Sequence, residues 1–249
     1  MVLLTELANY IASLLETDRF RDYSPNGVQV EGRAEVRRIA SGVTASQHVL
    51  EQAAAWGADA LLVHHGYFWR NEVPVLTGIK KRRIAHLLQH DISLLAYHLP
   101  LDAHPQLGNN VRLGQELGFI PRGTYGEQAL ALHGEVAQTR TLDELAQHIR
   151  ARLGRAPLVI GDGKRTIARI AWCTGAAQGY FEQAAGLAVD AFLTGEISEQ
   201  NVHMAEETGV AFIAAGHHAT ERYGIQALGG HLAERFGLEH RFFDQDVPV

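Results

Sequence analysis

Residues 38–62 (RIASGVTASQHVLEQAAAWGADALL) and residues 169–193 (RIAWCTGAAQGYFEQAAGLAVDAFL) decide the fold. The second stretch matches the first at a constant offset of 131 residues, and each has the pattern of a strand, a helix and another strand. All βαβ units look alike to some degree, but four consecutive identities (Glu-Gln-Ala-Ala) inside a gap-free match favour an internal duplication. Short apolar runs alternate with amphipathic stretches elsewhere too, which is typical of mainly parallel sheets. The sequence therefore predicts an α/β fold of two similar halves, related by a pseudo-twofold axis, with mainly parallel sheets flanked by helices.

Hydrophobic periodicity places the individual elements. Strands are predicted at 37–43, 59–64, 92–98, 157–160, 167–173, 190–194 and 210–215. Helices are predicted at 2–16, 46–56, 79–90, 109–117, 141–153, 178–187, 198–208 and 219–236. The stretch 121–127 is the weakest for regular structure, so we place the boundary between the two halves there, which gives 1–124 and 125–249.

The composition is that of an ordinary soluble globular protein, with 249 residues of which 46% are hydrophobic and 20% charged. The net charge of −6 argues against nucleic acid as a partner, because neutralising phosphates requires clustered lysines and arginines. The one basic cluster, Lys80 to Arg83, is followed by Ile84 and Leu87. This spacing predicts the solvated face of an amphipathic helix rather than a binding patch.

The single cysteine, Cys173, excludes an internal disulfide and indicates a reducing compartment. Because no acid–base pair lies beside it in sequence, we interpret Cys173 as a buried residue rather than a nucleophile. The N-terminus lacks the basic stretch and apolar core of a signal peptide, and no apolar run approaches the roughly 20 residues that span a bilayer. We therefore expect a cytoplasmic protein without a membrane partner.

Histidines follow three of the predicted strands. His64 and His65 come directly after one apolar run, His98 after the next, and His217 with its neighbour His218 after a third. In open α/β sheets, ligands bind just beyond the carboxyl ends of strands, so these side chains are expected to converge on one crevice. Adjacent strand residues point to opposite faces, so His64 and His65 can share a site only if the chain turns there. We expect Gly66 to supply that turn.

An acid lies four residues after a strand-end histidine at two places: Asp102 after His98, and Glu221 after His217. The two pairs are related by an offset of 119 residues, which also aligns the strands before them. At 217–221 the chain is expected to enter a helix, where positions i and i+4 lie on one face, so Glu221 can join His217. A lone strand-end histidine is usually just a satisfied polar residue, but three clusters with paired acids favour metal ligands. Imidazole and carboxylate donors suit Zn, Fe, Mn or Ni.

Three further features carry weaker expectations. Residues 161–166 (GDGKRT) lack the spacing of a phosphate-binding loop and predict a hairpin turn between two strands. Glu196 aligns with His65 at the 131-residue offset and is expected to face the same crevice without binding metal. His104, two residues after Asp102, is expected to support the ligands from outside the coordination shell.

Five stretches of the chain, taken in order, resemble the Nif-three-like family, whose members are commonly called GTP cyclohydrolase I type 2 homologues. The match runs from about residue 5 to 245 and is most similar to the short bacterial YbgI-like members. The stretches are 24–32 (SPNGVQVEG), 63–69 (VHHGYFW), 98–102 (HLPLD), 193–196 (LTGE) and 216–221 (GHHATE).

The resemblance implies a centre of two divalent metal ions with Glu221 as the bridging ligand. It also implies a homohexamer, a trimer of dimers that forms a toroid with the metal sites facing an internal cavity. The full ligand set implied is His64, His65, Asp102, His217 and Glu221.

The resulting functional hypothesis is a metal-dependent hydrolase that acts on a nucleotide or a related small molecule. His98 is the candidate catalytic residue, as an acid–base group or an extra ligand. The cyclohydrolase label is inherited, and no residue here identifies a guanine or triphosphate pocket. One alternative is a non-catalytic metal-binding or metal-delivery protein. Another is a ring that threads DNA, which the net charge of −6 disfavours.

Overall fold

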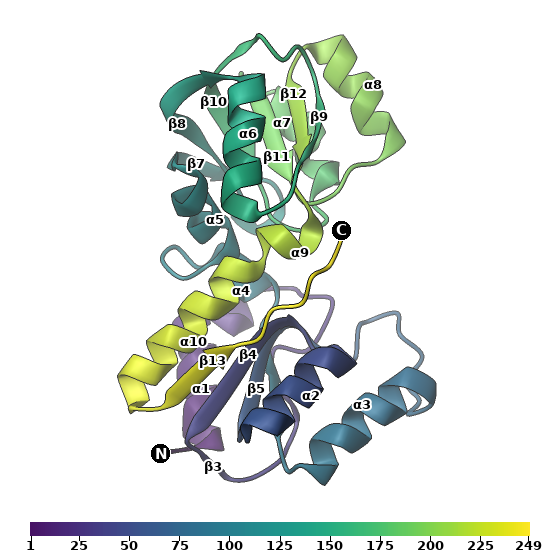
Figure 1. Cartoon of the computed structure of the whole chain (residues 1–249), viewed down its shortest axis with the longest axis vertical. Coiled ribbons are helices and arrows are strands. Elements are labelled where there is room, and N and C mark those ends of the chain that lie inside the picture. Colours follow the sequence, from purple (N-terminus) through teal and green to yellow (C-terminus); the bar gives the residue numbers. More distant parts are fainter. The chain divides into compact units, whose positions relative to one another are not determined.

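A computed structural model describes the whole chain, Met1 to Val249, and divides it into two compact units. Unit 1 comprises Met1–Leu107 and Gly224–Asp246, and unit 2 comprises Gly108–Tyr223 and Val247–Val249. Each unit is a sheet with helices on both faces, so the predicted fold of two α/β halves is confirmed (Figure 1). No helix combines the length and the apolar character needed to cross a membrane.

The division of the chain differs from the one placed near residue 124. Unit 1 ends its first segment at Leu107, and the chain returns to it at Gly224 within the long helix α10 (Arg222–Phe236). The reason is packing, because Ile225, Leu228 and Leu232 of α10 are fully buried in the core of unit 1. Unit 1 is therefore not one continuous stretch of chain, because the C-terminal helix α10 completes its core.

The sheet of unit 1 has five strands in the order β13-β4-β5-β6-β2. All neighbours are parallel except the β2–β6 pair at one edge. The strands are β13 (Glu239–Phe242), β4 (Arg38–Thr44), β5 (Ala60–His65), β6 (Ser93–Ala96) and β2 (Gly27–Val30), and β1 (Val2–Leu3) and β3 (Glu35–Val36) form a separate pair. The helices are α1 (Leu4–Leu15), α2 (Gln47–Trp56), α3 (Gly78–Gln89) and α4 (Leu99–Ala103), with α10 and a short 3-10 turn, η1 (Thr17–Arg19).

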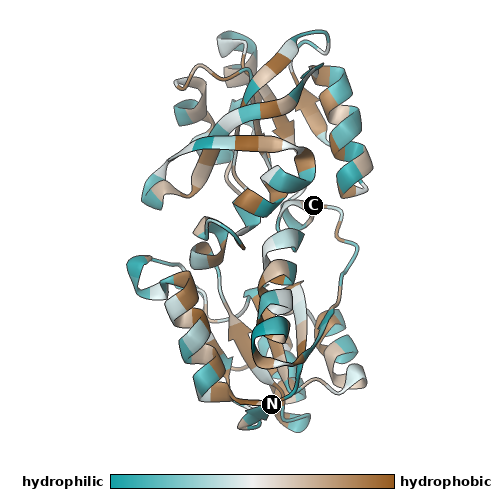
Figure 2. Cartoon of the chain, turned by 90° about the vertical axis from the view of Figure 1, so that its left-hand side faces the viewer, coloured by the Kyte–Doolittle hydropathy of each residue, from teal (hydrophilic) through white to brown (hydrophobic).

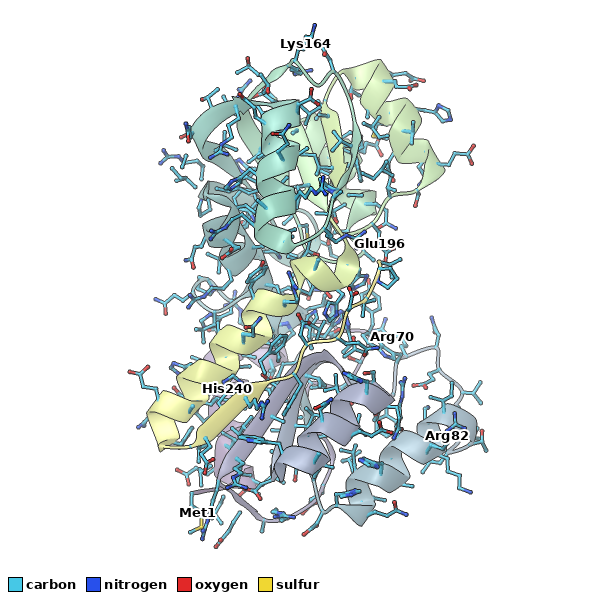
Figure 3. The ribbon with its side chains drawn as sticks, in the orientation of Figure 1. Met1, Arg70, Arg82, Lys164, Glu196 and His240 are labelled. Carbon is cyan, nitrogen blue, oxygen red and sulfur yellow. The ribbon has the colours of Figure 1, made fainter.

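Alternating side chains of the strands build two hydrophobic layers in unit 1. Leu62 of β5 packs in the cluster that contains α1 and α10, whereas its neighbours Leu61 and Val63 pack in the cluster that contains α2 and α3. Figure 2 shows the same arrangement, with hydrophobic strands between helices of mixed hydropathy. On α3, Lys81 and Arg82 are exposed, as predicted for a solvated face. Arg82 is labelled in Figure 3.

The sheet of unit 2 has six strands in the order β7-β8-β10-β11-β12-β9. Its centre is parallel, and β7, β8 and β9 pair antiparallel with their neighbours. The strands are β7 (Phe119–Tyr125), β8 (Ala131–Thr141), β9 (Leu158–Ile160), β10 (Thr166–Trp172), β11 (Ala191–Thr194) and β12 (Ala211–Ala214). Helices α5 (Asn109–Leu117) and α6 (Leu142–Leu153) cover one face of this sheet, and α7 (Phe181–Ala185) and α8 (Glu199–Thr208) cover the other. The short helix α9 (His217–Thr220) follows β12. Two 3-10 turns complete the unit, η2 (Glu127–Ala129) and η3 (Gln178–Tyr180).

Two local predictions in unit 2 are wrong. The stretch 121–127 is not irregular, because β7 covers most of it and is held by its antiparallel partner β8. Residues 161–166 do turn the chain, but they do not form a hairpin, since β9 pairs with β12 while β10 pairs with β8 and β11. In both cases strand pairing with a distant segment decides the structure.

The internal repeat has a counterpart in equivalent hydrogen bonds of the two units. In unit 1, Oδ2 of Asp59 accepts the backbone N–H groups of Arg37 and Arg38 at 2.7 and 2.9 Å. In unit 2, Oδ2 of Asp190 accepts those of Ala168 and Arg169 at 3.0 and 2.8 Å. The two aspartates are related by the same 131-residue offset. The match in sequence is thus also a match in tertiary contacts.

Candidate metal centre

Two histidines at the end of β5 lie side by side in unit 1. The His64 imidazole is fully buried, and its Nδ1 lies 3.0 Å from the backbone carbonyl oxygen of Tyr97, to which it can only donate. Nδ1 of His65 lies 3.1 Å from the hydroxyl of Thr44. A histidine that donates from Nδ1 keeps its lone pair on Nε2, the nitrogen left for a metal ion.

Gly66 has a different role from the one predicted. The rings of His64 and His65 lie with centroids 4.6 Å apart while β5 still runs through His65, so no turn at Gly66 is needed to bring them together. A Cβ at Gly66 would instead overlap the side chain of Gln29, whose Oε1 accepts the backbone N–H of Tyr67 at 2.7 Å. The glycine therefore permits a close approach of β2 beside the histidines.

His98 and Asp102 complete the cluster from the end of β6. His98 precedes α4, and Asp102 lies within that helix with its Oδ1 3.5 Å from Nε2 of His64. The ring of His98 lies 5.0 Å from that of His64 and 5.7 Å from that of His65, measured between centroids. Donor atoms of the three histidines lie within 4.8 Å of one another, a spacing at which they could hold an ion.

Asp22 is a site residue that the sequence reasoning missed. Its Oδ1 accepts Nδ1–H of His98 at 2.7 Å, and its Oδ2 accepts the backbone N–H of Leu99 at 2.9 Å. Burial works to raise the pKa of Asp22, but the hydrogen bond and charge of His98, with hydrogen bonds from Asn26 and Tyr23, outweigh burial and lower it. The sequence feature that could have pointed to this segment is the turn at 24–27, which begins two residues after Asp22. In the structure, Oδ1 of Asn26 in this turn accepts the backbone N–H of His98 at 2.8 Å.

In unit 2, His217 begins α9 and Glu221 follows directly after this helix. Nε2 of His217 lies 3.0 Å from Oε2 of Glu221, as expected for positions i and i+4 at a helix start. Glu196, just after β11, accepts Nδ1–H of His217 at 2.7 Å. This contact places Glu196 beside His217 within unit 2.

The loop after β10 that contains Gly175, here called the Gly175 loop, lies against Glu221 within unit 2. Gly175 has a left-handed φ of +68°, and a Cβ there would overlap the Glu221 carboxylate. The hydroxyl of Thr220 accepts the backbone N–H of Gly175 at 3.0 Å and holds this loop against α9. Glu221 is only 3% exposed. A buried carboxylate beside an imidazole is a donor set that a divalent cation fits.

The surroundings of His217 determine a pH-dependent stability in the metal-free protein. Burial works to lower the pKa of His217, but Glu221 and Glu196 outweigh it and raise the pKa from 6.5 to about 9. Because the folded state holds this proton more tightly than the unfolded state, its contribution is complete below pH 6.5 and is lost as the pH rises through 9.

We therefore expect the metal-free protein to lose about 2–3 kcal/mol of unfolding free energy between these two pH values. Urea unfolding of the chelator-treated protein measures this loss. A His217→Gln variant is the control, because it lacks the titrating imidazole and is expected to show a much smaller change. Equal pH dependence in both proteins would contradict the assignment.

Two other residues singled out in the sequence have contacts within their own unit. His104 is placed in a turn of unit 1, where its Nδ1 accepts the backbone N–H groups of Gln106 and Leu107 at 3.2 and 3.0 Å. Cys173 is 5% exposed and packs beside Ala131 and Ala177, which confirms that it is buried.

Comparisons with known proteins agree with this arrangement of motifs. Residues 2–248 match the family described as Duf34/NIF3 (NGG1p interacting factor 3). A relative from Pseudomonas aeruginosa, named GTP cyclohydrolase 1 type 2 homolog, is 54% identical over 251 residues, which cover 100% of this chain and 99% of the relative. A relative of the same name from Escherichia coli is 50% identical over 246 residues, which cover 98% of this chain and 99% of the relative.

Solved structures show the same likeness. The protein ybgI, described as of unknown function, superposes with a TM-score of 0.97 at 49% identity and full coverage of both chains, that is 100% of each. A protein from Thermus thermophilus superposes with a TM-score of 0.90 at 34% identity, again over 100% of each chain. The chain belongs to the DUF34/NIF3 family.

Proposed function

We propose that the protein binds two divalent metal ions and uses them to hydrolyse a nucleotide or a related small molecule. The ions are drawn from Zn, Fe, Mn and Ni, and Glu221 is the ligand shared by both. The ligand set follows from the sequence motifs and the family, and the contacts within each unit support its parts separately. The five ligands are His64, His65, Asp102, His217 and Glu221.

The observation that carries the proposal is the position of a polar partner beside Nδ1 of each of the two histidines at the end of β5. Each has its Nδ1 beside a polar partner, the carbonyl of Tyr97 for His64 and the hydroxyl of Thr44 for His65. Histidines that bind metals characteristically make such a hydrogen bond through their other ring nitrogen, which fixes the tautomer and the orientation of the ring. The two rings are therefore oriented for coordination through Nε2.

Unit 2 supports the proposal in the same way. Glu196 holds Nδ1 of His217, and the Nε2 of His217 is directed at Glu221. In the metal-free protein this Nε2 carries a proton, because the pKa of His217 is about 9. Coordination requires the deprotonated nitrogen, so metal binding is expected to release this proton.

The chemistry assigned to these residues is hydrolytic. Two adjacent divalent ions lower the pKa of water toward neutrality and polarise a phosphoryl or amide-type oxygen. The carboxylates of Asp102 and Glu221 offset part of the cationic charge, and Glu196 keeps His217 in one orientation. The buried setting of His64 and Glu221 limits the access of competing water around the ligands.

A substrate screen tests the proposal. Nucleotides and phosphoesters are incubated with the metal-loaded wild type and with an Asp102→Ala variant. We expect turnover by the wild type and a loss of about 100-fold or more in the variant, because even outer partners of a metal site are worth 10- to 100-fold. An Asp18→Ala variant removes an exposed carboxylate of the same unit and is the matched control. No metal-dependent turnover of any class would contradict a hydrolase.

Metal exchange separates this function from a non-catalytic metal-delivery role. His64 is fully buried and Glu221 is 3% exposed, which favours slow release of a bound ion. A slow transfer to an added chelator supports the catalytic function. Rapid exchange, together with activation of metal-free acceptor enzymes on mixing, would support delivery instead.

We further propose the homohexamer implied by the family. In support, the segment after β5 exposes apolar side chains: Val73, Val75, Leu76 and Ile79 are 49–68% exposed. Exposed apolar side chains gathered in one segment are typical of surfaces covered by a partner. Light scattering is expected to give six times the 27.3 kDa chain mass, and a monomer would contradict the assembly.

A further inference from the structure

Asp22 and His98 form a buried contact in unit 1 that joins segments 76 residues apart in the chain. The Asp22 side chain is 4% exposed and the His98 side chain 15% exposed. Oδ1 of Asp22 is 2.7 Å from Nδ1 of His98, and Oδ2 accepts the N–H of Leu99, so both carboxylate oxygens hold the start of α4.

This contact determines which nitrogen of His98 faces the other histidines. A carboxylate accepts hydrogen bonds only, so in the neutral imidazole the proton lies on Nδ1 and the lone pair on Nε2. The donor atoms of His98, His64 and His65 lie within 4.8 Å of one another. Donors bound to one ion at about 2.1 Å lie about 3.4 Å apart, so small side-chain rotations close the set.

The same arrangement recurs in unit 2 with a different acid. His217 is the counterpart of His98 at the 119-residue offset, and Glu196 accepts its Nδ1–H at the same 2.7 Å. Glu196 aligns with His65 at the 131-residue offset, so it is not the repeat counterpart of Asp22. Two unrelated positions of the chain thus supply a carboxylate to the same nitrogen of equivalent histidines.

The Asp22 segment is itself held in place. The amide of Asn26 donates to Oδ2 of Asp22 at 2.9 Å, and the guanidinium of Arg70, on the loop after β5, donates to the Asp22 carbonyl at 2.7 Å (Figure 3). The ring of Trp69 packs edge-to-face on His98, with centroids 5.1 Å apart. The orientation of His98 is therefore set before any ligand binds.

We propose that Asp22 is the positioning residue that fixes His98 as a third imidazole ligand of the metal ion held by His64 and His65. This inference rests on the proposed metal binding and adds a ligand and its supporting carboxylate to the five-residue set. Carboxylates that support a ligating histidine affect metal affinity by about 10- to 100-fold. Asp22 acts through His98, so the two substitutions should not have independent effects.

The test is a titration of the metal-free, full-length protein with Co(II), followed by visible absorption. We expect Asp22→Asn and His98→Ala each to weaken Co(II) affinity by about 10- to 100-fold and to change the d–d spectrum in the same way. The double variant is expected to bind no more weakly than His98→Ala alone. Asp18→Ala is the matched control, because it removes an exposed carboxylate four residues before Asp22 and is expected to leave the Co(II) affinity and spectrum unchanged.

Each other outcome has a definite meaning. If the wild type binds Co(II) and both single variants bind it equally well, His98 is not a ligand and the inference fails. Effects that add in the double variant, or an Asp18→Ala spectrum like that of Asp22→Asn, would show a structural role only. A wild type that binds no Co(II) contradicts the proposed function itself. Nitrogen-15 NMR of the metal-free wild type, at a pH where His98 is neutral, gives an independent reading. A neutral His98 ring with its proton on Nε2 instead of Nδ1 would overturn the inference even if Asp22→Asn failed to fold.

Discussion

A Glu221→Ala variant is expected to lose most of the metal that the wild type retains, which we expect to be about two ions per chain. Glu221 is 3% exposed, lies 3.0 Å from Nε2 of His217 and is enclosed by the Gly175 loop. As the shared ligand it would contribute to both ions, whereas loss of an unshared ligand would affect chiefly one. Elemental analysis of the purified variant measures the effect.

The control for this prediction is Glu207→Ala, which removes an exposed carboxylate of α8 in the same unit. It is expected to retain the wild-type metal content. Circular dichroism of both variants establishes that unit 2 is folded when the metal is counted. A folded Glu221→Ala protein with undiminished metal would remove the bridging role.

Trp172→Ala is expected to lower the free energy of unfolding by about 3–5 kcal/mol. The Trp172 side chain is fully buried at the end of β10, and its Nε1–H donates to the carbonyl of Asn110 at 2.8 Å. The ring packs against Phe119 with centroids 5.3 Å apart, and it lies so close to Gly114 that a Cβ there would come within 2.9 Å. The substitution therefore leaves a large cavity and removes a buried hydrogen bond.

Chemical denaturation followed by circular dichroism measures this loss. Leu158→Ala on the edge strand β9 is the matched control, since that side chain is 52% exposed, and we expect a change within about 0.5 kcal/mol. A loss below about 1 kcal/mol for Trp172→Ala would mean that α5 and the sheet repack around the gap.

Much of the fold was predictable from local sequence. The helix at 109–117 and the strand at 190–194 were placed within a residue of α5 and β11. Apolar residues repeat with the period of the element that buries them, so a short window of sequence contains the signal. The pairing of His217 with Glu221 was predictable for the same reason, because a spacing of four residues at a helix start brings two side chains together.

The partners of the histidines came only from the tertiary structure. Asp22 precedes His98 by 76 residues, and Glu196 precedes His217 by 21, so neither contact belongs to one helix or strand. The pairing of β7 with β8 and the return of α10 to unit 1 likewise went unpredicted.

The sequence by itself thus determined the duplication, the periodic elements and the histidines at the strand ends. The tertiary structure decided which acid orients each histidine and which segment completes each core. The physical reason is that periodicity records which face of an element is buried. A hydrogen bond between distant segments depends instead on where the chain returns, which no local pattern encodes.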